Sequence, residues 1–408
     1  EIKTIIGKGS MFEGTSTVHG KPLDKVDLDK IRQKLNSRDI PFAVSKDSAT
    51  LFRDMINNRS NKKIQAYNDI YSKLNDEVRT DITNLLSGDM TISISDLFTE
   101  LNTDQGREIS SKVLNTIANH TQYFIGGSAD VSSSTKTTLS NFEDFSSQDY
   151  SGKNIWFGVR EHAMGAILNG LALSNIRPFA STFLAFSDYM KPAIRLAAIM
   201  KLPVIYVFTH DSISMGNDGP THQPIEQLAM LRSIPNLDVY RPCDAREIVG
   251  SYTEALKKKD GPSAIIISRS ELKLQLDTNV DISRGGYIVR KEKNKLDGII
   301  VATGKEVDNA IMAANNLEVR GKDIRVVSMP NMKSFFKQSS KYINDILPSG
   351  IKIIVVEASS SYGWHQLTTS KFIIAVDTFG KSGNEEEVYN DFKFDLKSIT
   401  DKVEKLLS

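Results

Sequence analysis

Apolar and polar residues alternate along the chain in two blocks, and each block predicts strands and helices in turn. In the first block, from about residue 107, short apolar runs are separated by segments whose apolar residues recur at helical spacing. The expected strands are Tyr123–Ile125, Ile155–Val159, Val204–Thr209, Asp238–Tyr240 and Ala264–Ser268, and the expected helices are Gly106–Ala118, Glu161–Leu173, Asp188–Met200, Ile225–Arg232 and Ala245–Lys258. This pattern predicts an α/β fold, a mostly parallel sheet with helices on both faces.

A second, smaller α/β block follows a charged stretch, Glu271–Arg284, which we interpret as a linker. Its expected elements are the strands Gly298–Ala302, Ile324–Ser328, Ile351–Glu357 and Phe372–Val376 and the helix Glu306–Leu317. Before the first block, the β-branched run Ile2–Ile6 is followed by polar residues 21–90 with helical patches at Asp29–Asn36 and Ile64–Leu74. These patches predict connecting helices without a core of their own.

Composition narrows the class of protein. A length of 408 residues predicts two or three domains. A near balance of 51 Lys and Arg against 50 Asp and Glu gives no electrostatic reason to expect nucleic acid. The single cysteine, Cys243, excludes an intramolecular disulfide and a cysteine-rich zinc site, and it suits a reducing compartment. The apolar runs are far shorter than the ~20 residues of a membrane helix, so a cytoplasmic protein without a membrane partner is expected.

Chemistry-bearing residues concentrate in one loop, His210–Gln223, which contains His210, His222 and Asp218. The loop follows the apolar strand Val204–Thr209, so it should lie at the carboxyl edge of a parallel sheet, where α/β proteins bind ligands. Two His and two Asp could form a metal site, but their spacing matches no common helical metal motif. A structural loop with capping Asp and Thr is the second alternative. We favour the third, a site for a polyhydroxylated or phosphorylated ligand.

Three further groups have both a structural and a functional interpretation. Glu161 opens a helix, where the helix dipole favours an acid, but it could also face a buried ligand nitrogen. Phe183, Phe186 and Tyr189 recur every three residues, a spacing that is more often core than cofactor site. Arg107, Ser134 and Arg269 could jointly hold a phosphate, although nothing local shows that they meet.

Together these segments resemble transketolase. The matching stretches are THDSISMGNDGPTHQP (Thr209–Pro224), GVREHAMGAILNG (Gly158–Gly170), STFLAFSDY (Ser181–Tyr189) and GGSADVSSS (Gly126–Ser134), in which Gly126-Gly127-Ser128 is expected to be a turn. Their order and spacing agree from VHGKPL (Val18–Leu23) to VDTFG (Val376–Gly380), so the resemblance covers essentially the whole chain.

The resemblance implies a fold and an activity. Residues 1–94 would be a remnant of the diphosphate-binding domain with a helical linker, 95–278 the pyrimidine-binding domain, and 284–408 the smaller transketolase C-terminal domain. The activity would be the transfer of a two-carbon ketol unit from a ketose phosphate to an aldose phosphate, in the pentose phosphate pathway. The cofactor would be thiamine diphosphate with Mg²⁺ or Ca²⁺, and the assembly a homodimer.

The resemblance also assigns the site residues. Around the cofactor, Glu161 would hydrogen-bond the pyrimidine N1′, an aromatic wall would enclose the ring, and two side chains would support the glutamate and the subunit contact. The wall is Phe183, Phe186 and Tyr189, and the supporting residues are Asp130 and His162. On the substrate, His19 and His210 would transfer the protons of hydroxyl groups. Asp218 would bind the C2 hydroxyl and so recognise its configuration, and His222 would stabilise the C1-side oxygens. The phosphate would be held by Arg107, Ser134 and Arg269. His365 is interpreted as structural, and His120 belongs to no motif.

The chain departs from the family where the metal should be bound. The family's Gly-Asp-Gly segment does not occur, and Gly88-Asp89-Met90 is no substitute for it. The resemblance therefore implies that most of the diphosphate-binding domain and the metal ligands are absent from this chain, and that the chain alone is inactive. Two alternatives stay open, a non-catalytic dimerising fragment and a sister thiamine enzyme such as dihydroxyacetone synthase or deoxyxylulose-phosphate synthase. Smaller departures lie at Ser270-Glu271 and at Lys381-Ser382-Gly383.

Overall fold

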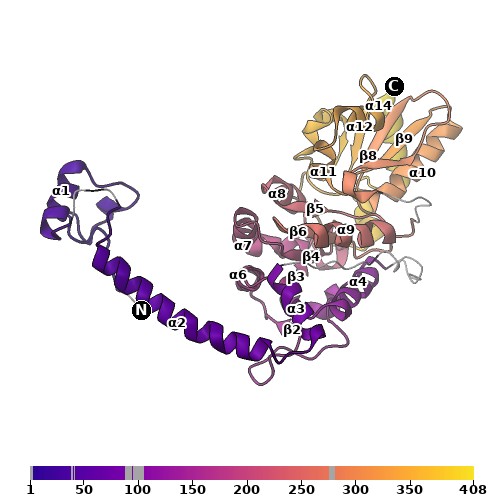
Figure 1. Cartoon of the computed structure of the whole chain (residues 1–408). Helices are drawn as coiled ribbons and strands as arrows, with labels where there is room; N and C mark the ends of the chain where they lie inside the picture. Colours follow the sequence, from indigo (N-terminus) through magenta and orange to yellow (C-terminus); the bar gives the residue numbers. More distant parts are fainter. Residues whose placement is uncertain (1–2, 38–39, 41, 88–93, 95–104, 275–280) are drawn as a thin grey trace. The chain divides into compact units, whose positions relative to one another are not determined.

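The computed structural model describes residues 3–37, 40, 42–87, 94, 105–274 and 281–408 (Figure 1). The chain divides into two compact units, Glu1–Thr80 and Asp81–Ser408. Among the described residues no helix is both long and apolar enough to cross a bilayer. The segment Gly88-Asp89-Met90 lies outside the described residues.

The smaller unit is helical. It contains the 3-10 turn η1 (Ser16–Val18), α1 (Lys25–Lys34), α2 (Lys46–Tyr71) and the first turn of α3 (Asp76–Ser87). Side-chain caps start two of these helices, because Asp24 accepts the backbone N–H of Asp27 and Ser45 accepts that of Ser48. Helix α2 is longer than the predicted patch and buries none of its residues. These helices therefore lack a core of their own, as expected.

The β-branched run Ile2–Ile6 forms no strand in its described part. The Ile5 carbonyl accepts the N–H of Lys8 at 3.2 Å, and the Ile6 carbonyl accepts the N–H of Gly14 at 2.8 Å, so both are used in local turns. Gly7 adopts a φ of 65°, which turns the chain away from an extended path. The β-branched composition does not produce a strand here, because β propensity acts only where a neighbouring strand supplies the hydrogen bonds.

The first domain of the larger unit is built on a six-stranded sheet in the order β2-β1-β3-β4-β6-β5, and every neighbouring pair is parallel. The strands are β1 (Phe124–Ser128), β2 (Asn154–Trp156), β3 (Arg177–Phe183), β4 (Ile205–Thr209), β5 (Asp238–Tyr240) and β6 (Ser263–Ile267). The helices are α4 (Gly106–His120), α5 (Ser132–Thr135), α6 (Glu161–Ala172), α7 (Ser187–Ile199), α8 (Gln227–Ser233) and α9 (Ala245–Lys257). The predicted parallel sheet is confirmed.

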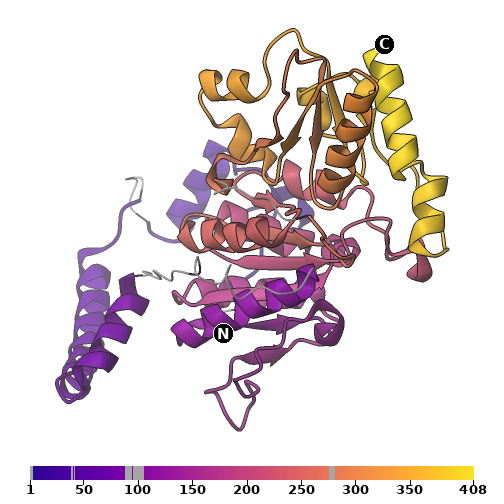
Figure 2. The ribbon, with the colours of Figure 1, turned by 90° about the vertical axis from the view of Figure 1, so that its right-hand side faces the viewer.

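Helices cover both faces of this sheet (Figures 1 and 2). Side chains of α4 and α9, among them Val113 and Tyr252, share one core with the strands. Side chains of α6, α7 and α8, among them Leu168 and Ile194, share a second core with the strands. The sheet is therefore the middle of three layers, and its carboxyl edge is left for the loops.

Two details of the first domain differ from the prediction. Gly126 and Gly127 are not in a turn but inside β1, where a Cβ on Gly126 would lie 2.0 Å from the carbonyl oxygen of Phe179 and one on Gly127 would lie 2.0 Å from that of Ile155. These glycines serve close packing of the neighbouring strands. Strand β3 was not predicted, because Pro178 and the polar Ser181 and Thr182 interrupt its apolar pattern although all seven residues are buried.

The second domain has a five-stranded sheet in the order β11-β10-β8-β9-β7, in which only β7 is antiparallel. The strands are β7 (Tyr287–Arg290), β8 (Gly298–Ala302), β9 (Ile324–Ser328), β10 (Ile353–Val356) and β11 (Ile373–Ile374), and the helices are α10 (Glu306–Val319), α11 (Met332–Phe336), α12 (Ser340–Ile346), α13 (Glu385–Asp391) and α14 (Leu396–Leu407). Strands β8 and β9 match their predicted bounds. Residues 275–280 of the expected linker lie outside the described residues.

Candidate active site

The first-domain sheet brings the candidate residues to one edge. Because β1, β2, β3, β4 and β6 are parallel, the residues that follow each strand lie at the same edge of the sheet. The candidates that follow these strands are Asp130 after β1, Glu161 after β2, Phe186 after β3, His210 after β4 and Arg269 after β6. The loop that begins at His210 thus lies at the carboxyl edge of the sheet, as its position after an apolar strand predicts.

Two histidines and the aromatic residues form one contiguous cluster. The ring centroids of Phe183 and His210 are 3.9 Å apart, and those of Phe186 and His222 are 5.2 Å apart. Phe183 also contacts Phe186 at 5.5 Å, and Phe186 contacts Tyr189 at 6.2 Å. The aromatic residues are neither a core stripe nor on one helix, because Phe183 ends β3, Phe186 ends the 3-10 turn η3 (Leu184–Phe186) and Tyr189 is exposed in the first turn of α7.

Cations gather beside this cluster. An Nη atom of Arg107 donates to the carbonyl oxygen of Ser134 at 2.7 Å. Burial lowers the pKa of Arg107, and the neighbouring Arg269 lowers it further. Burial also lowers the pKa of His210 to about 3, with added repulsion from Arg107, Arg269 and His222. The residues proposed for phosphate binding therefore do meet, next to the histidines.

The backbone and a threonine fix the orientation of His210. Its φ is 62°, a left-handed value that is uncommon for a side chain of this size. Its Nδ1 shares a hydrogen bond of 2.7 Å with the Thr209 hydroxyl, and Nδ1 of His222 shares one of 2.9 Å with Thr221. Both imidazoles therefore have Nε2 to offer to a ligand.

The lowered pKa of His210 predicts acid lability. Between pH 6.5, the ordinary value for unfolded His, and about pH 3, the unfolded chain binds a proton that the folded chain does not. Stability should therefore fall with falling pH, by up to about 1.4 kcal/mol per pH unit from this group. His210→Gln should flatten the slope by about one proton, as measured by urea unfolding at pH 5 and pH 7. An unchanged slope would contradict the burial of a neutral imidazole.

Glu161 is the first residue of α6 and is 8% exposed. Helices α6 and α7 approach closely, because a Cβ on Gly165 would lie 2.7 Å from the Cβ of Ala193 and 2.9 Å from Cγ of Met190. The first turns of the two helices are therefore neighbours. This places the Glu161 carboxyl and the aromatic residues at the same end of the helix pair.

The remaining predicted residues are less enclosed. Asp130 has a φ of 63° just after β1 and is exposed, and Asp218 is exposed in the 3-10 turn η4 (Gly216–Asp218). His162 is exposed on α6. His19 belongs to the smaller unit. His365 is exposed, and its Nε2 shares a hydrogen bond with the Ser370 hydroxyl at 3.0 Å, consistent with a structural role.

A buried ion network behind His210 was missed by sequence reasoning. Arg241, which follows β5, donates from Nε to Asp211 at 3.0 Å and from Nη2 to the same oxygen at 2.7 Å. It also donates to Glu306 of the second domain, and Arg241, Asp211 and Glu306 are all at most 1% exposed. Asp211 directly follows His210, so the network connects the histidine loop to the second domain.

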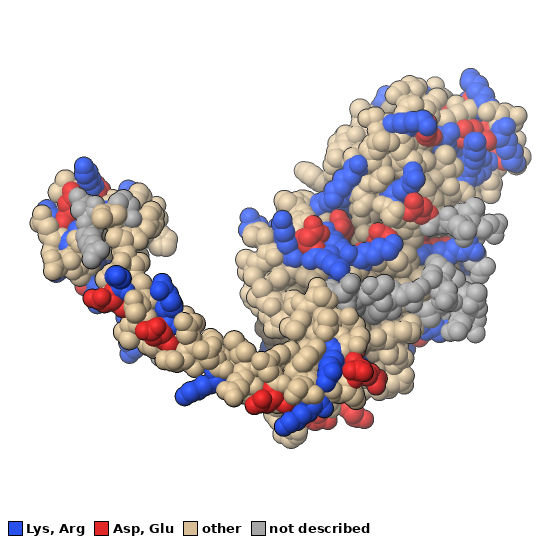
Figure 3. Space-filling model, in the orientation of Figure 1, with Lys and Arg blue, Asp and Glu red and all other residues tan. Residues whose placement is uncertain are grey.

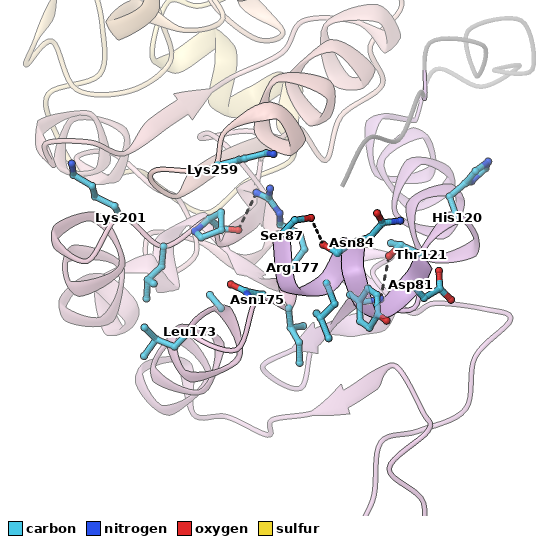
Figure 4. Close-up of a pocket in the computed structure, with 16 residues that line it drawn as sticks. Asp81, Asn84, Ser87, His120, Thr121, Leu173, Asn175, Arg177, Lys201 and Lys259 are labelled. Carbon is cyan, nitrogen blue, oxygen red and sulfur yellow. Dashed lines mark hydrogen bonds between the residues drawn. The ribbon is translucent and has the colours of Figure 1, made fainter. Parts of the chain in front are cut away.

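A cavity of about 420 Å³ lies at the opposite, amino edge of the first sheet (Figure 4). It is lined by Asp81, His120, Arg177, Lys201 and other residues, none of them a predicted site residue. The guanidinium of Arg177 donates to four backbone carbonyls, of Pro203, Ala255, Leu256 and Lys258. Arg177 is therefore committed to holding the ends of the surrounding elements together.

No group of three or more His, Cys, Asp or Glu that could hold a metal ion occurs within the described ranges. The donors at the carboxyl edge are instead a buried carboxyl, aromatic rings, imidazoles and guanidinium groups. Such a set fits an aromatic heterocycle next to an anionic sugar ligand.

The comparisons with known proteins agree with this geometry. Three family models match consecutive parts of the chain: the thiamine diphosphate binding domain of transketolase at residues 1–90, its pyrimidine binding domain at 105–275 and the transketolase-like C-terminal domain at 285–395.

Individual relatives match over the whole chain. The transketolase of Bacillus subtilis is 40% identical over 425 residues, covering 100% of this chain and 64% of the relative. A crystal structure of transketolase in complex with sedoheptulose-7-phosphate from Pichia stipitis matches with a TM-score of 0.90 at 34% identity, covering 100% of this chain and 62% of that one. The transketolase of Campylobacter jejuni matches with a TM-score of 0.88 at 35% identity, covering 98% of this chain and 62% of that one. This chain thus spans less than two thirds of the length of these relatives, and it belongs to the transketolase family.

Proposed function

We propose that the chain takes part in ketol transfer, the movement of a two-carbon unit from a ketose phosphate to an aldose phosphate. The observation that carries this proposal is the meeting of His210 and His222 with Arg107 and Arg269 at one sheet edge. Imidazoles can relay hydroxyl protons while guanidinium groups bind a phosphate. A relative that was solved with sedoheptulose-7-phosphate supports a sugar phosphate as the substrate. The pathway we propose is the pentose phosphate pathway, in the cytoplasm.

The donor set fits the pyrimidine end of thiamine diphosphate. When bound, this cofactor supplies a carbon nucleophile that can accept and pass on the ketol unit. We propose that Glu161 hydrogen-bonds the ring nitrogen N1′ and that its burial favours the sharing of a proton there. Phe183, Phe186 and Tyr189 would enclose the ring, with Asp130 and His162 supporting the glutamate and the subunit contact. Mg²⁺ or Ca²⁺ would accompany the diphosphate group.

Each substrate residue has a proposed task. His210, through Nε2, would take and return the proton of a substrate hydroxyl, with His19 as its counterpart from the diphosphate-binding part. Asp218 would read the C2 hydroxyl, and His222 would stabilise the C1-side oxygens. Arg107, anchored on Ser134, and Arg269 would bind the phosphate. We propose the division 1–94, 95–278 and 284–408 for the three domains that carry these residues.

We also propose a homodimer through the outer face of α6 and α7. Six large apolar side chains on or beside these helices are 45–65% exposed, namely Ile167, Leu173, Tyr189, Leu196, Ile199 and Met200. A patch of this kind marks a protein interface. Elsewhere on the surface that Figure 3 shows, Lys and Arg occur together with Asp and Glu, in keeping with their near-equal numbers of 51 and 50. Sedimentation should detect a dimer that Leu196→Asp weakens.

Arg269→Ala tests the proposed substrate class. In an enzyme with a complete diphosphate-binding domain, the change should raise the KM for phosphorylated donors about 10- to 100-fold, because a charge-assisted hydrogen bond contributes about 1.5–3 kcal/mol. The KM for an unphosphorylated donor should hardly change. Arg320→Ala is the matched control, since Arg320 binds Asp401 and Glu404 on the surface of the second domain. Equal losses on both donors would mean that Arg269 supports the fold and not the phosphate.

A further inference from the structure

A second pocket lies between the two domains of the larger unit, and none of the candidate site residues lines it. Its volume is about 670 Å³, within the range of pockets that hold small organic ligands. The first domain contributes Ala229 and Met230 of α8, and the second contributes Met332 and Phe336 of α11. Domain interfaces are a usual place for such pockets.

The pocket has one rigid, neutralised wall. The guanidinium of Arg232 makes two hydrogen bonds to the Glu357 carboxylate, at 2.7 and 2.8 Å. The indole N–H of Trp364 donates to the same carboxylate at 2.7 Å, and Arg232 lies over the indole at 5.2 Å. Glu357 and Trp364 are fully buried. This wall is therefore preformed, and its charges are already matched.

One end of the pocket carries unmatched positive charge. Nζ of Lys333 donates to the carbonyls of Ile234 and Leu237, both at 2.7 Å, just beyond the end of α8. Burial lowers the pKa of Lys333 to about 8, Lys258 and Lys337 lower it further, and Asp238 opposes them. Asp238 is itself paired with Lys258 at 2.5 Å. Lys333 and Lys337 both line the pocket and repel each other there.

The negative charge in the lining lies at the other end. Glu226 precedes α8, whereas Lys333 binds the residues that follow this helix. At 1.5 Å per residue, the eight steps from Glu226 to Ile234 span about 12 Å. The pocket is therefore polarised along α8, with an apolar middle and a cationic end at Lys333 and Lys337.

We propose that this pocket binds a small molecule with an apolar body and one oxyanion group. The body would pack against Met230, Met332 and Phe336, and the oxyanion would bind at Lys333 and Lys337. Because the walls come from two domains, occupancy would also stabilise their contact by linkage. This inference does not depend on the proposed ketol transfer.

A pair of fluorescent probes, used on the full chain, tests whether the pocket binds an apolar body and whether it also prefers an anionic group. The anion 8-anilinonaphthalene-1-sulfonate should bind about tenfold more tightly than uncharged N-phenyl-1-naphthylamine, since one charge-assisted contact is worth about that factor. Ala229→Phe, which fills the pocket, should abolish saturable binding of both probes. Lys337→Met should weaken the sulfonate about fivefold or more and leave the neutral probe unchanged.

Val319→Asp, at the end of α10 and 90% exposed, is the matched control and should leave the saturable site intact. Circular dichroism confirms folding of each variant, and Met230→Trp replaces Ala229→Phe if the latter fails to fold. Sulfonate binding that survives the filling variant would overturn the site. Equal weakening of both probes by Lys337→Met would overturn the assignment of an anionic ligand.

Discussion

In an enzyme with a complete diphosphate-binding domain, Glu161→Gln should fold like the parent and lose most of the ketol-transfer turnover, about 10²- to 10⁴-fold in kcat. Glu161 is buried at the start of α6, beside the first turn of α7, which contains Tyr189 and follows Phe186. The amide of Gln has the same shape and can donate a hydrogen bond to a ring nitrogen. It cannot share a proton with that nitrogen, which is the proposed task of the carboxyl. The measurement is kcat at saturating thiamine diphosphate and Mg²⁺.

A control variant at a second glutamate distinguishes a catalytic role of Glu161 from a role in helix capping. Glu386 is exposed in the first turn of α13, which contributes no predicted site residue, so Glu386→Gln removes a similar charge from a helix start. Both variants should lose at most about 1 kcal/mol of stability through the helix dipole, and only Glu161→Gln should lose turnover. If the parent binds the cofactor without turnover, calorimetric affinity for thiamine diphosphate replaces kcat as the measurement. If kcat or the cofactor affinity of Glu161→Gln equals that of the parent, Glu161 serves only to stabilise the start of its helix.

The sequence predicts those features of the fold that depend on local pattern. Strands Asp238–Tyr240, Gly298–Ala302 and Ile324–Ser328 are predicted to the residue, because each is a short segment rich in β-branched or aromatic residues between two helical segments or turns. Strand β3 was missed because a central strand is defined by its two neighbours, and these bury Ser181 and Thr182 as fully as Phe179. Likewise, Gly126 and Gly127 suggest a turn until the neighbouring backbones that need the space are known.

The candidate site also has features that the local sequence predicts and features that depend on contacts between distant segments. The loop with His210 and His222 could be placed at the sheet edge from its position after a strand alone. The proximity of Arg107 to Arg269 could not be predicted from the sequence. Arg107 lies at the start of α4 and Arg269 follows β6, and no local sequence pattern connects them. The ion pair of Asp211 could not be predicted for the same reason, since its partner Arg241 follows a different strand.

Arg241→Met should destabilise the larger unit by about 3–5 kcal/mol, the largest stability effect we expect from a single substitution. Arg241 is the cation that contacts both Asp211 and Glu306, and burial raises the pKa of Glu306 while Arg241 lowers it. Methionine matches the side chain in length but leaves both carboxyls buried without a positive charge. Urea unfolding of the full chain at pH 7 gives the shift in midpoint.

Arg320→Met provides the comparison for an exposed ion network. Arg320 also binds two acids, Asp401 and Glu404, yet its side chain is 43% exposed, so its removal should cost less than about 1 kcal/mol. Adding Asp211→Asn and Glu306→Gln to Arg241→Met should recover part of the loss, since the penalty comes from uncompensated charge. Equal effects of Arg241→Met and Arg320→Met would contradict the argument. Because Asp211 is adjacent to His210, we also expect Arg241→Met to loosen the loop that positions this imidazole.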